Sequence, residues 1–406
     1  SPRWRGGLHM FELRAHDGGL TAHSSALDQD GTPFYIKGVT WRGMEGGEDR
    51  RGETKAPPNG LMQQSLDELL AKLARNKFNA IRLTVNHLSI LRNEAMTDYG
   101  DLDVAKNPWF AGNRYVSLLR AIAVRAAAHG VLVVVAVTRL APTDIVDGER
   151  ERKPPGLWYS GHVANTFSGW EMPERTIEQN WRQLGDALCS QWNIVGVDLM
   201  DGLRAATWGQ KEPTDWDLAA SRFGNEVLKH CPRWLVFVHG IGASAAAVDA
   251  FDGANLADAA SAPVALANSA KLVYVARLRG PSEGWRGYFG AGFPASLEQP
   301  FRRQWSALQD ASGVPVVVAL GSPWDSVREE AFVEFATQFV TRQGHSVFYD
   351  ALNPADVTTG HAEAGLVADG SWSSLSQPRL EALQFLRSTD LTGWLRPPAP
   401  PRPPPL

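Results

Sequence analysis

The sequence has only two cysteines, no long apolar run and no large excess of charge, and each shortage excludes a class of protein. With Cys189 and Cys231 alone, no spacing suits zinc or iron–sulfur ligation. A formal net charge of -4 gives no bulk attraction for nucleic acid or for an anionic membrane. The longest apolar runs, such as residues 131–137, have the length of a strand and not of a membrane span. We therefore expect no metal, no nucleic-acid partner and no membrane span.

Two common catalytic signatures are also missing. The sequence has no Gly-x-Ser-x-Gly elbow, and His239 has no recognisable partners for a serine hydrolase. It has no glycine-rich phosphate loop of the dinucleotide or Walker type. We therefore expect no cofactor. If the protein is an enzyme, we expect it to use neither a serine-hydrolase triad nor a bound nucleotide.

What the chain does contain is a regular alternation of apolar runs of strand length with segments of helical period. Eight strands are predicted, at residues 34–40, 80–85, 131–139, 195–200, 235–240, 271–278, 315–320 and 346–352. Helices are predicted at residues 65–77, 113–129, 176–192, 216–230, 299–312, 326–343 and 377–388. Residues 243–270 are rich in alanine and show no clear helix. This pattern predicts an α/β protein with one (β/α)8 TIM barrel over residues 34–390.

The two ends of the chain differ from the barrel. Residues 1–33 are expected to form a short N-terminal β segment that packs on it. Residues 391–406 are proline-rich and favour an extended polyproline II conformation. Three roles are open for this segment: a linker, a stiff stalk that is hydroxylated and glycosylated, or a ligand for a proline-reading domain. Cys189 and Cys231 each lie near the end of a predicted helix, so the sequence allows either a disulfide between them or two free thiols.

One segment carries a family resemblance. Residues 195–203 read Val-Gly-Val-Asp-Leu-Met-Asp-Gly-Leu, and Ala-Thr-Trp-Gly follows at 206–209. This resembles the fourth barrel strand of glycoside hydrolase family 5, the cellulase-like hydrolases, which runs Gly-x-Asp-Leu-x-Asn-Glu-Pro-His and ends in a similar Ala-Thr-Trp-Gly. Asn-x-Ile-Arg-Leu at 79–83 and Asn-Pro at 353–354 match in the same order. The resemblance implies an active site at the carboxyl ends of the strands.

Both catalytic glutamates of that family are replaced in this alignment. Asn-Glu-Pro has become Asp201-Gly202-Leu203, so the acid/base position falls on Asp201 or on Gly202. The seventh strand of the family ends Gly-Glu-Phe-Gly, and Leu320 stands in place of the nucleophilic glutamate. A retaining glycosidase needs two carboxyl groups about 5 Å apart, and leucine cannot attack an anomeric carbon. The resemblance therefore predicts degenerate catalytic positions.

Other positions at the expected barrel mouth carry charge. Arg82 and Arg139 match arginines of the family, whereas Arg277 and Arg279 stand where it has a histidine and a tyrosine. Asp350 replaces a tryptophan of the eighth strand. Four arginines in one pocket should bind either the aspartates or an anionic ligand such as a uronate, a sulfated glycan or a phosphate. Further ligand-binding candidates are His239, Trp41 and Trp208, with Trp285, Trp324 and Trp372 as other possible stacking faces.

These residues favour a catalytically inactive barrel that acts as a carbohydrate-binding or structural head domain. The alternative is an active endo-β-glucanase-like glycosidase with relocated carboxylates such as Asp201 and Asp350, or Asp325. Because the resembled family is largely secreted, we expect an extracellular, cell-wall or cell-surface location. Expected partners are a carbohydrate or another extracellular glycoprotein, with assembly through the proline-rich tail.

Overall fold

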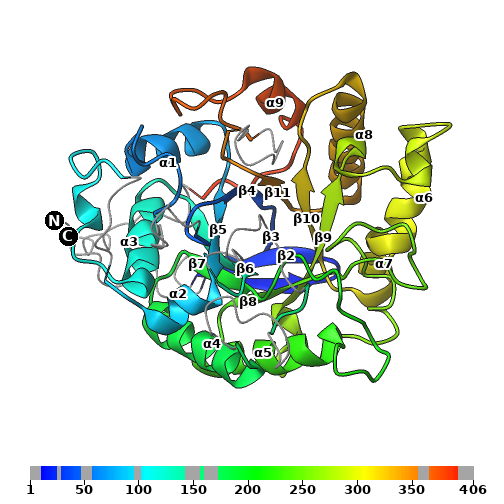
Figure 1. The fold of residues 1–406 in the computed structure, drawn as a ribbon, viewed down its shortest axis with the longest axis horizontal. Helices are drawn as coiled ribbons and strands as arrows, with labels where there is room; N and C mark the ends of the chain where they lie inside the picture. Colours follow the sequence, from blue (N-terminus) through cyan, green and yellow to red (C-terminus); the bar gives the residue numbers. More distant parts are fainter. Residues whose placement is uncertain are drawn as a thin grey trace, which may run out of the picture.

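The structure is a computed structural model, and it describes residues 11–24, 29–46, 57–95, 102–141, 156–159, 172–354 and 365–391. Eight parallel strands close into one barrel, in the order β10-β11-β4-β5-β6-β7-β8-β9 (Figure 1). The strands are β4 (Lys37–Trp41), β5 (Ala80–Asn86), β6 (Leu132–Arg139), β7 (Ile194–Asp198), β8 (Leu235–His239), β9 (Leu272–Arg279), β10 (Val316–Gly321) and β11 (Val347–Asp350). The predicted (β/α)8 barrel is confirmed.

Helices surround the barrel as a ring (Figure 1). The α-helices are α1 (Leu66–Arg75), α2 (His87–Arg92), α3 (Tyr115–Ala128), α4 (Glu174–Leu188), α5 (Trp216–His230), α6 (Glu298–Phe301), α7 (Ala307–Ser312), α8 (Val327–Gln343) and α9 (Gln377–Ala382). Short turns of helix are η2 (Pro108–Phe110), η3 (Ser269–Lys271), η4 (Pro281–Glu283), η5 (Gly287–Phe289), η6 (Ala295–Leu297) and the π-type η7 (Arg302–Ser306). Residues 243–268, all of them described, contain no helix despite their alanine content, in agreement with the absence of a clear helical pattern over residues 243–270, of which only the last two belong to η3.

Each barrel strand serves two cores, because successive side chains of a strand point to opposite faces. On β10, Val317 and Ala319 belong to the inner core, whereas Val316, Val318 and Leu320 belong to the outer core between barrel and helices. Burial on both faces explains the continuous apolar runs in the sequence.

The N-terminal segment closes one end of the barrel. Its antiparallel sheet consists of β1 (Glu12–His16), β2 (Gly19–Ser24) and β3 (Gln29–Phe34). Leu13 and Phe34 belong to the inner core. Lys271, fully buried, donates hydrogen bonds to Glu12 Oε1 at 2.6 Å, the Leu13 carbonyl at 2.9 Å and the Arg233 carbonyl at 3.0 Å. These contacts tie the sheet to the amino end of β9.

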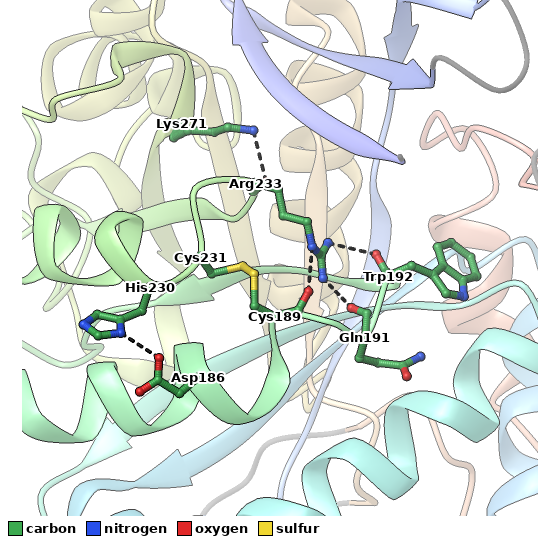
Figure 2. The surroundings of a disulfide bond; sticks show 8 residues. All are labelled: Asp186, Cys189, Gln191, Trp192, His230, Cys231, Arg233 and Lys271. Atoms are coloured by element: carbon green, nitrogen blue, oxygen red, sulfur yellow. Dashed lines mark hydrogen bonds and ion pairs between the residues drawn. A yellow bond between two sulfur atoms is a disulfide. The ribbon is translucent and has the colours of Figure 1, made fainter. Parts of the chain in front are cut away.

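A disulfide links two neighbouring helices at the same end. Cys189 follows α4, Cys231 follows α5, and their sulfur atoms are bonded with the Cα atoms 5.4 Å apart. Figure 2 shows Arg233 beside this bond, where it donates to the carbonyls of Cys189 at 2.8 Å and Trp192 at 3.1 Å. The bond and the arginine together hold the chain after α4. No helix in the described ranges has both the length and the hydrophobicity that a membrane crossing requires.

Candidate active site

Charged side chains from four alternate strands come together at the mouth of the barrel. Arg82 lies on β5, Asp198 on β7, Arg277 and Arg279 on β9, and Asp350 on β11. In the barrel order β7 and β11 are four places apart and so face each other, and β5 and β9 lie midway on either side. Alternate strands contribute side chains to one layer of such a barrel. Positive and negative charges therefore alternate around the mouth.

Arg82 organises one half of this layer. Its Nε and Nη2 atoms each lie 2.8 Å from Asp198 Oδ2, and Nη2 lies 3.3 Å from Asp201 Oδ2. His239, at the end of β8, places Nε2 2.8 Å from the same Asp198 oxygen and Nδ1 3.5 Å from Asp201 Oδ1. All four side chains are buried. Asp198 and Asp201 thus both contact His239, and both also form ion pairs with Arg82.

Asp350 organises the other half. Its Oδ2 atom lies 2.7 Å from Nη2 of Arg279, and its Oδ1 atom lies 3.0 Å from Nη2 of Arg42, the residue that follows β4. Burial alone would raise the pKa of Asp350, but Arg42, Arg279, Arg277 and Arg82 outweigh it and hold that pKa well below its usual range. Asp350 is therefore a fixed anion at neutral pH.

Arg277 connects the two halves. Its Nη1 atom lies 3.6 Å from Asp201 Oδ1 and its Nη2 atom lies 3.8 Å from Asp350 Oδ2. Burial opposes the ionisation of Asp201, but Arg277 first, then His239 and Arg82, hold its pKa well below its usual range. One guanidinium thus lies between carboxylates from opposite sides of the barrel.

The structure changes the position assigned to the family's nucleophile. Leu320 is buried in the outer core, so its side chain points away from the mouth. Gly321 follows it and takes the inward position opposite Arg279 in the strand pairing. A Cβ atom on Gly321 would lie 1.8 Å from Nη1 of Arg279. The space into which a side chain at residue 321 would project is therefore filled by arginine.

The other residues predicted from the sequence are Gly202, Arg139, Trp41 and Trp208. Gly202, with φ 75°, donates its amide to Asp201 Oδ1 at 2.7 Å and carries no acid. Arg139 lies at the carboxyl end of β6, opposite Asn86 of β5. Trp41 and Trp208 are buried, and their indole nitrogens donate to the carbonyls of Asn59 at 2.9 Å and Ala262 at 2.7 Å. Neither tryptophan offers a face to a sugar, because both pack in the outer core.

Several charged residues of this end were not singled out from the sequence. Arg42 and Asp198 take part in the ion pairs above, and the Gly-x-Asp-Leu match at residue 198 was the available signal. Glu45 accepts from the Thr84 hydroxyl and, at 2.7 Å, from the Gly43 amide. Glu329 accepts from the Ser322 hydroxyl and, at 2.7 Å, from the Ser282 amide. Both glutamates hold loops in place. The described residues form no group of acidic, histidine or cysteine side chains placed to hold a metal ion.

An eight-stranded barrel with acidic side chains at its mouth is the architecture of many glycosidases, and comparisons with known proteins identify the family. Residues 27–319 match the family model described as cellulase (glycosyl hydrolase family 5), which is more than half of the chain. The chain belongs to glycosyl hydrolase family 5. It is 24% identical over 375 residues to an endoglucanase of Paenibacillus polymyxa, covering 89% of this chain and 85% of the relative.

Solved structures show the same fold. An endocellulase from Pyrococcus horikoshii in complex with cellotetraose superposes with a TM-score of 0.79 at 24% identity, covering 93% of this chain and 98% of that one. The catalytic domain of the major endoglucanase of Xanthomonas campestris pv. campestris gives a TM-score of 0.76 at 21% identity, covering 92% and 99%.

These findings correct the main functional prediction from the sequence. The hypothesis of an inactive pseudoenzyme, serving only as a binding or structural head, is wrong: the family is one of glycosyl hydrolases and the matched relative is an endoglucanase. Loss of the family's glutamates does not remove every acid group from the mouth, and the findings favour the alternative of a glycosidase with relocated carboxylates such as Asp201 and Asp350. Asp201, Asp350 and Asp198 keep three carboxylates at the mouth.

Proposed function

We propose that this protein is an O-glycosyl hydrolase of the endo-β-glucanase type, with Asp201 and Asp350 as its catalytic carboxylates. The observation that carries the proposal is the contact of one guanidinium, that of Arg277, with carboxylates from opposite sides of the barrel, at 3.6 Å and 3.8 Å. Hydrolysis of a glycosidic bond requires two carboxyl groups on either side of the scissile bond. Membership of the cellulase family supports a β-linked glucan as the substrate class.

The two aspartates would have different tasks. Asp350 is surrounded by more arginines and stays ionised, so it is the base that takes a proton from water as that water attacks the anomeric carbon. Asp201 gives a proton to the glycosidic oxygen as the carbon–oxygen bond breaks. Because Arg277 holds the pKa of Asp201 low, Asp201 takes up that proton only when the bound sugar separates it from the Arg277 guanidinium. The products gain the elements of one water, and the two carboxyl groups exchange the net proton with solvent. A guanidinium between the carboxylates keeps them apart, which suits inversion, where the separation is about 6.5–9.5 Å.

The test is an assay of purified protein on hydroxyethylcellulose, mixed-linkage β-glucan and a carboxymethylated cellulose, with reducing ends measured over time. Asp201→Asn and Asp350→Asn should each lower the rate at least about 100-fold, as expected when an acid/base group is removed. Asp325→Asn is the matched control, because Asp325 lies in an exposed loop and accepts from Ser282 Oγ at 2.8 Å. No release by the wild type on any substrate, or full activity of Asp201→Asn, would refute the proposal.

We also propose that the protein works in an oxidising compartment outside the cytoplasm. The Cys189–Cys231 disulfide supports this, because such bonds persist chiefly in secreted and extracellular proteins. Thiol titration of native protein from its own source, after unfolding without reductant, should detect no free thiol. Two reactive thiols would contradict the proposal. The proline-rich residues 392–406 lie outside the described ranges.

A further inference from the structure

Glu45 places a further carboxylate at the barrel mouth. It lies in the loop that follows β4, and its side chain accepts a hydrogen bond from the hydroxyl of Thr84 on β5. The residues on either side of Thr84 belong to the outer core, so Thr84 itself points into the barrel. Arg82, two residues earlier on the same strand, faces the same way. The Glu45 carboxylate therefore lies on the inner side of the mouth, nearer its rim than the residues that pair with Arg82.

Neighbouring groups fix one oxygen of this carboxylate. Oε2 of Glu45 accepts from the Thr84 hydroxyl and, at 2.7 Å, from the Gly43 amide. Gly43 has φ 132°, a conformation that favours glycine, and a Cβ atom there would lie 2.5 Å from the Asn59 amide nitrogen. The main-chain carbonyl of Glu45 also accepts from Asn86 Nδ2 at 2.9 Å. The carboxylate is thus held in place before any ligand binds.

The other oxygen, Oε1, is not used in this way. Within the described ranges it accepts no hydrogen bond, and no arginine, lysine or histidine forms an ion pair with Glu45. An ionised carboxylate can accept about four hydrogen bonds, and a buried one is normally surrounded by donors or paired with a cation. Glu45 is 8% exposed. Its second oxygen therefore has room for donors that the described part of the chain does not supply.

We propose that Glu45 is a substrate-binding residue, and that its Oε1 atom accepts hydrogen bonds from hydroxyl groups of the bound sugar chain. The inference rests on the proposed glycosidase for the presence of a sugar at this mouth, and it adds a binding residue to the catalytic pair. Hydroxyl groups are the donors that a glucan chain offers. A hydrogen bond from a hydroxyl to a carboxylate is roughly twice as strong as one between neutral groups.

Glu45 would act in binding and not in proton transfer, because Asp201 and Asp350 carry out the proton transfers. Since Thr84 and Gly43 already hold its carboxylate, little side-chain freedom is lost when the sugar binds. A bond of this kind stabilises the bound sugar equally in the ground state and in the transition state. Its loss should therefore raise KM and leave kcat nearly unchanged.

Glu45→Gln tests the second oxygen while the loop stays in place, because the glutamine carbonyl can still accept from Thr84 and Gly43. The amide nitrogen replaces Oε1 and turns an acceptor into a donor. Calorimetry in the Asp350→Asn background, which prevents turnover, should show roughly tenfold weaker binding of cellotetraose. Xylotetraose, which lacks the carbon-6 hydroxymethyl group, is the second ligand. A smaller loss with xylotetraose would assign the bond to that group, and an equal loss would assign it to ring hydroxyls.

A second variant tests the hold on the carboxylate. Thr84→Val removes the hydroxyl that donates to Oε2 and should weaken binding less than Glu45→Gln does. Thr84→Ser keeps the hydroxyl and should bind as the unsubstituted protein. Glu329→Gln is the matched control for Glu45→Gln, since Glu329 also accepts from a serine hydroxyl and a backbone amide but is fully buried. Melting temperatures show whether each variant is folded.

Kinetics in the wild-type background separate this inference from the proposed function. Glu45→Gln should raise KM for a soluble β-glucan about tenfold with little change in kcat. Unchanged affinity in Glu45→Gln, an equal loss in Glu329→Gln, or no binding of either oligosaccharide would overturn the inference, even if the enzyme hydrolyses glucan. Binding that depends on Glu45, without any hydrolysis by the wild type, would leave the inference standing and refute the proposed function.

Discussion

The guanidinium of Arg279 occupies the space into which a side chain on Gly321 would project. A Cβ atom on Gly321 would lie 1.8 Å from Nη1 of Arg279 and 3.0 Å from the Asp350 carbonyl oxygen. Arg279 cannot move aside freely, because its Nη2 atom is 2.7 Å from Asp350 Oδ2. Glycine at 321 and arginine at 279 therefore depend on each other.

This dependence predicts a coupled pair of substitutions. Gly321→Ala should cost about 1–3 kcal/mol of unfolding free energy, because the added methyl group overpacks the buried Arg279–Asp350 pair. In an Arg279→Met background the same alanine should cost less, since a flexible uncharged side chain can move aside. Urea denaturation of the wild type, both single variants and the double variant measures the coupling. Additive costs would show that the two residues do not compete for the space.

A second prediction concerns acid stability. Asp350 and Asp201 have folded pKa values below the unfolded value of about 3.9, so they contribute stability that is present above that pH. The contribution is lost as the pH falls from about 4 through the lower folded pKa values. Asp350→Asn should be less stable at neutral pH, because Arg42 and Arg279 lose their anion. Its melting temperature should also fall less steeply below pH 4 than that of the wild type.

Melting curves at pH 2.5 to 7 provide the measurement. Asp325→Asn, at an exposed position, is the control and should follow the wild type. The same acid slope in the wild type and in Asp350→Asn would contradict the prediction.

The barrel was predictable from the sequence because its strands are buried on both faces and read as continuous apolar runs, as in β6 and β10. The first sheet was predictable only as a vague β segment, since residues of β3 such as Gln29 and Asp30 give little apolar signal. Helix α2 was missed because its six residues are too few to show a period; Asn86 caps it by accepting from the Ser89 amide at 2.7 Å.

The charged cluster at the mouth could be predicted in its members but not in the directions of their side chains. Arg82, Asp201, Arg277, Arg279 and Asp350 are joined by ion pairs, because all lie on or just after strands of one barrel. Aligning Leu320 with the family's nucleophile was misleading, because an alignment of residues does not show to which face of a strand a side chain points. A shift of one residue moves a side chain from the mouth to the outer core.

A third prediction is that the disulfide contributes strongly to stability. The bond joins Cys189 to Cys231 across a sequence separation of 42 residues. Loss of loop entropy from the unfolded state predicts about 4 kcal/mol for a loop of this size. The Cys189→Ser, Cys231→Ser double variant should lose about 2–4 kcal/mol while keeping its secondary structure. Oxidised wild type treated with reductant should reach the same midpoint of denaturation; an unchanged midpoint would contradict the prediction.

A fourth prediction concerns the closed end of the barrel. Lys271 donates to Glu12 and to the carbonyls of Leu13 and Arg233, so Lys271→Met leaves these two carbonyls without this donor, while the partly exposed Glu12 still accepts from Arg14 at 2.9 Å. We expect a loss of about 1–3 kcal/mol, typical of leaving buried polar groups without a hydrogen bond. Lys229→Met is the matched control, because the Lys229 side chain is exposed where it pairs with Glu226 at 2.8 Å. A loss under about 1 kcal/mol in Lys271→Met would show that the first sheet is not anchored there.

The last prediction concerns a sugar-stacking surface at the rim of the mouth. Of the tryptophans in the described ranges, Trp285 is the one with a largely exposed side chain, at 62%, and it lies in the loop after β9, on the same side as Arg277. Its ring lies 6.3 Å from that of Phe289, and the Arg328 guanidinium lies 5.5 Å from its centroid. These contacts hold the ring in place, and its exposure leaves apolar aromatic surface open to solvent, which suits the face of a pyranose ring. Trp285→Ala should weaken binding of long oligosaccharides about 3- to 10-fold with little change for disaccharides, because the ring lies away from the scissile bond. Trp285→Phe should retain part of the affinity.

Phe385→Ala is the matched control, since Phe385 is also exposed but lies at the other end of the barrel. Its neighbour Ser388 donates its hydroxyl to the Lys77 carbonyl, near the amino end of β5. Affinities for oligosaccharides of two to six sugars decide the matter: a loss that is equal at every length would place Trp285 in the folding of the loop and not in binding.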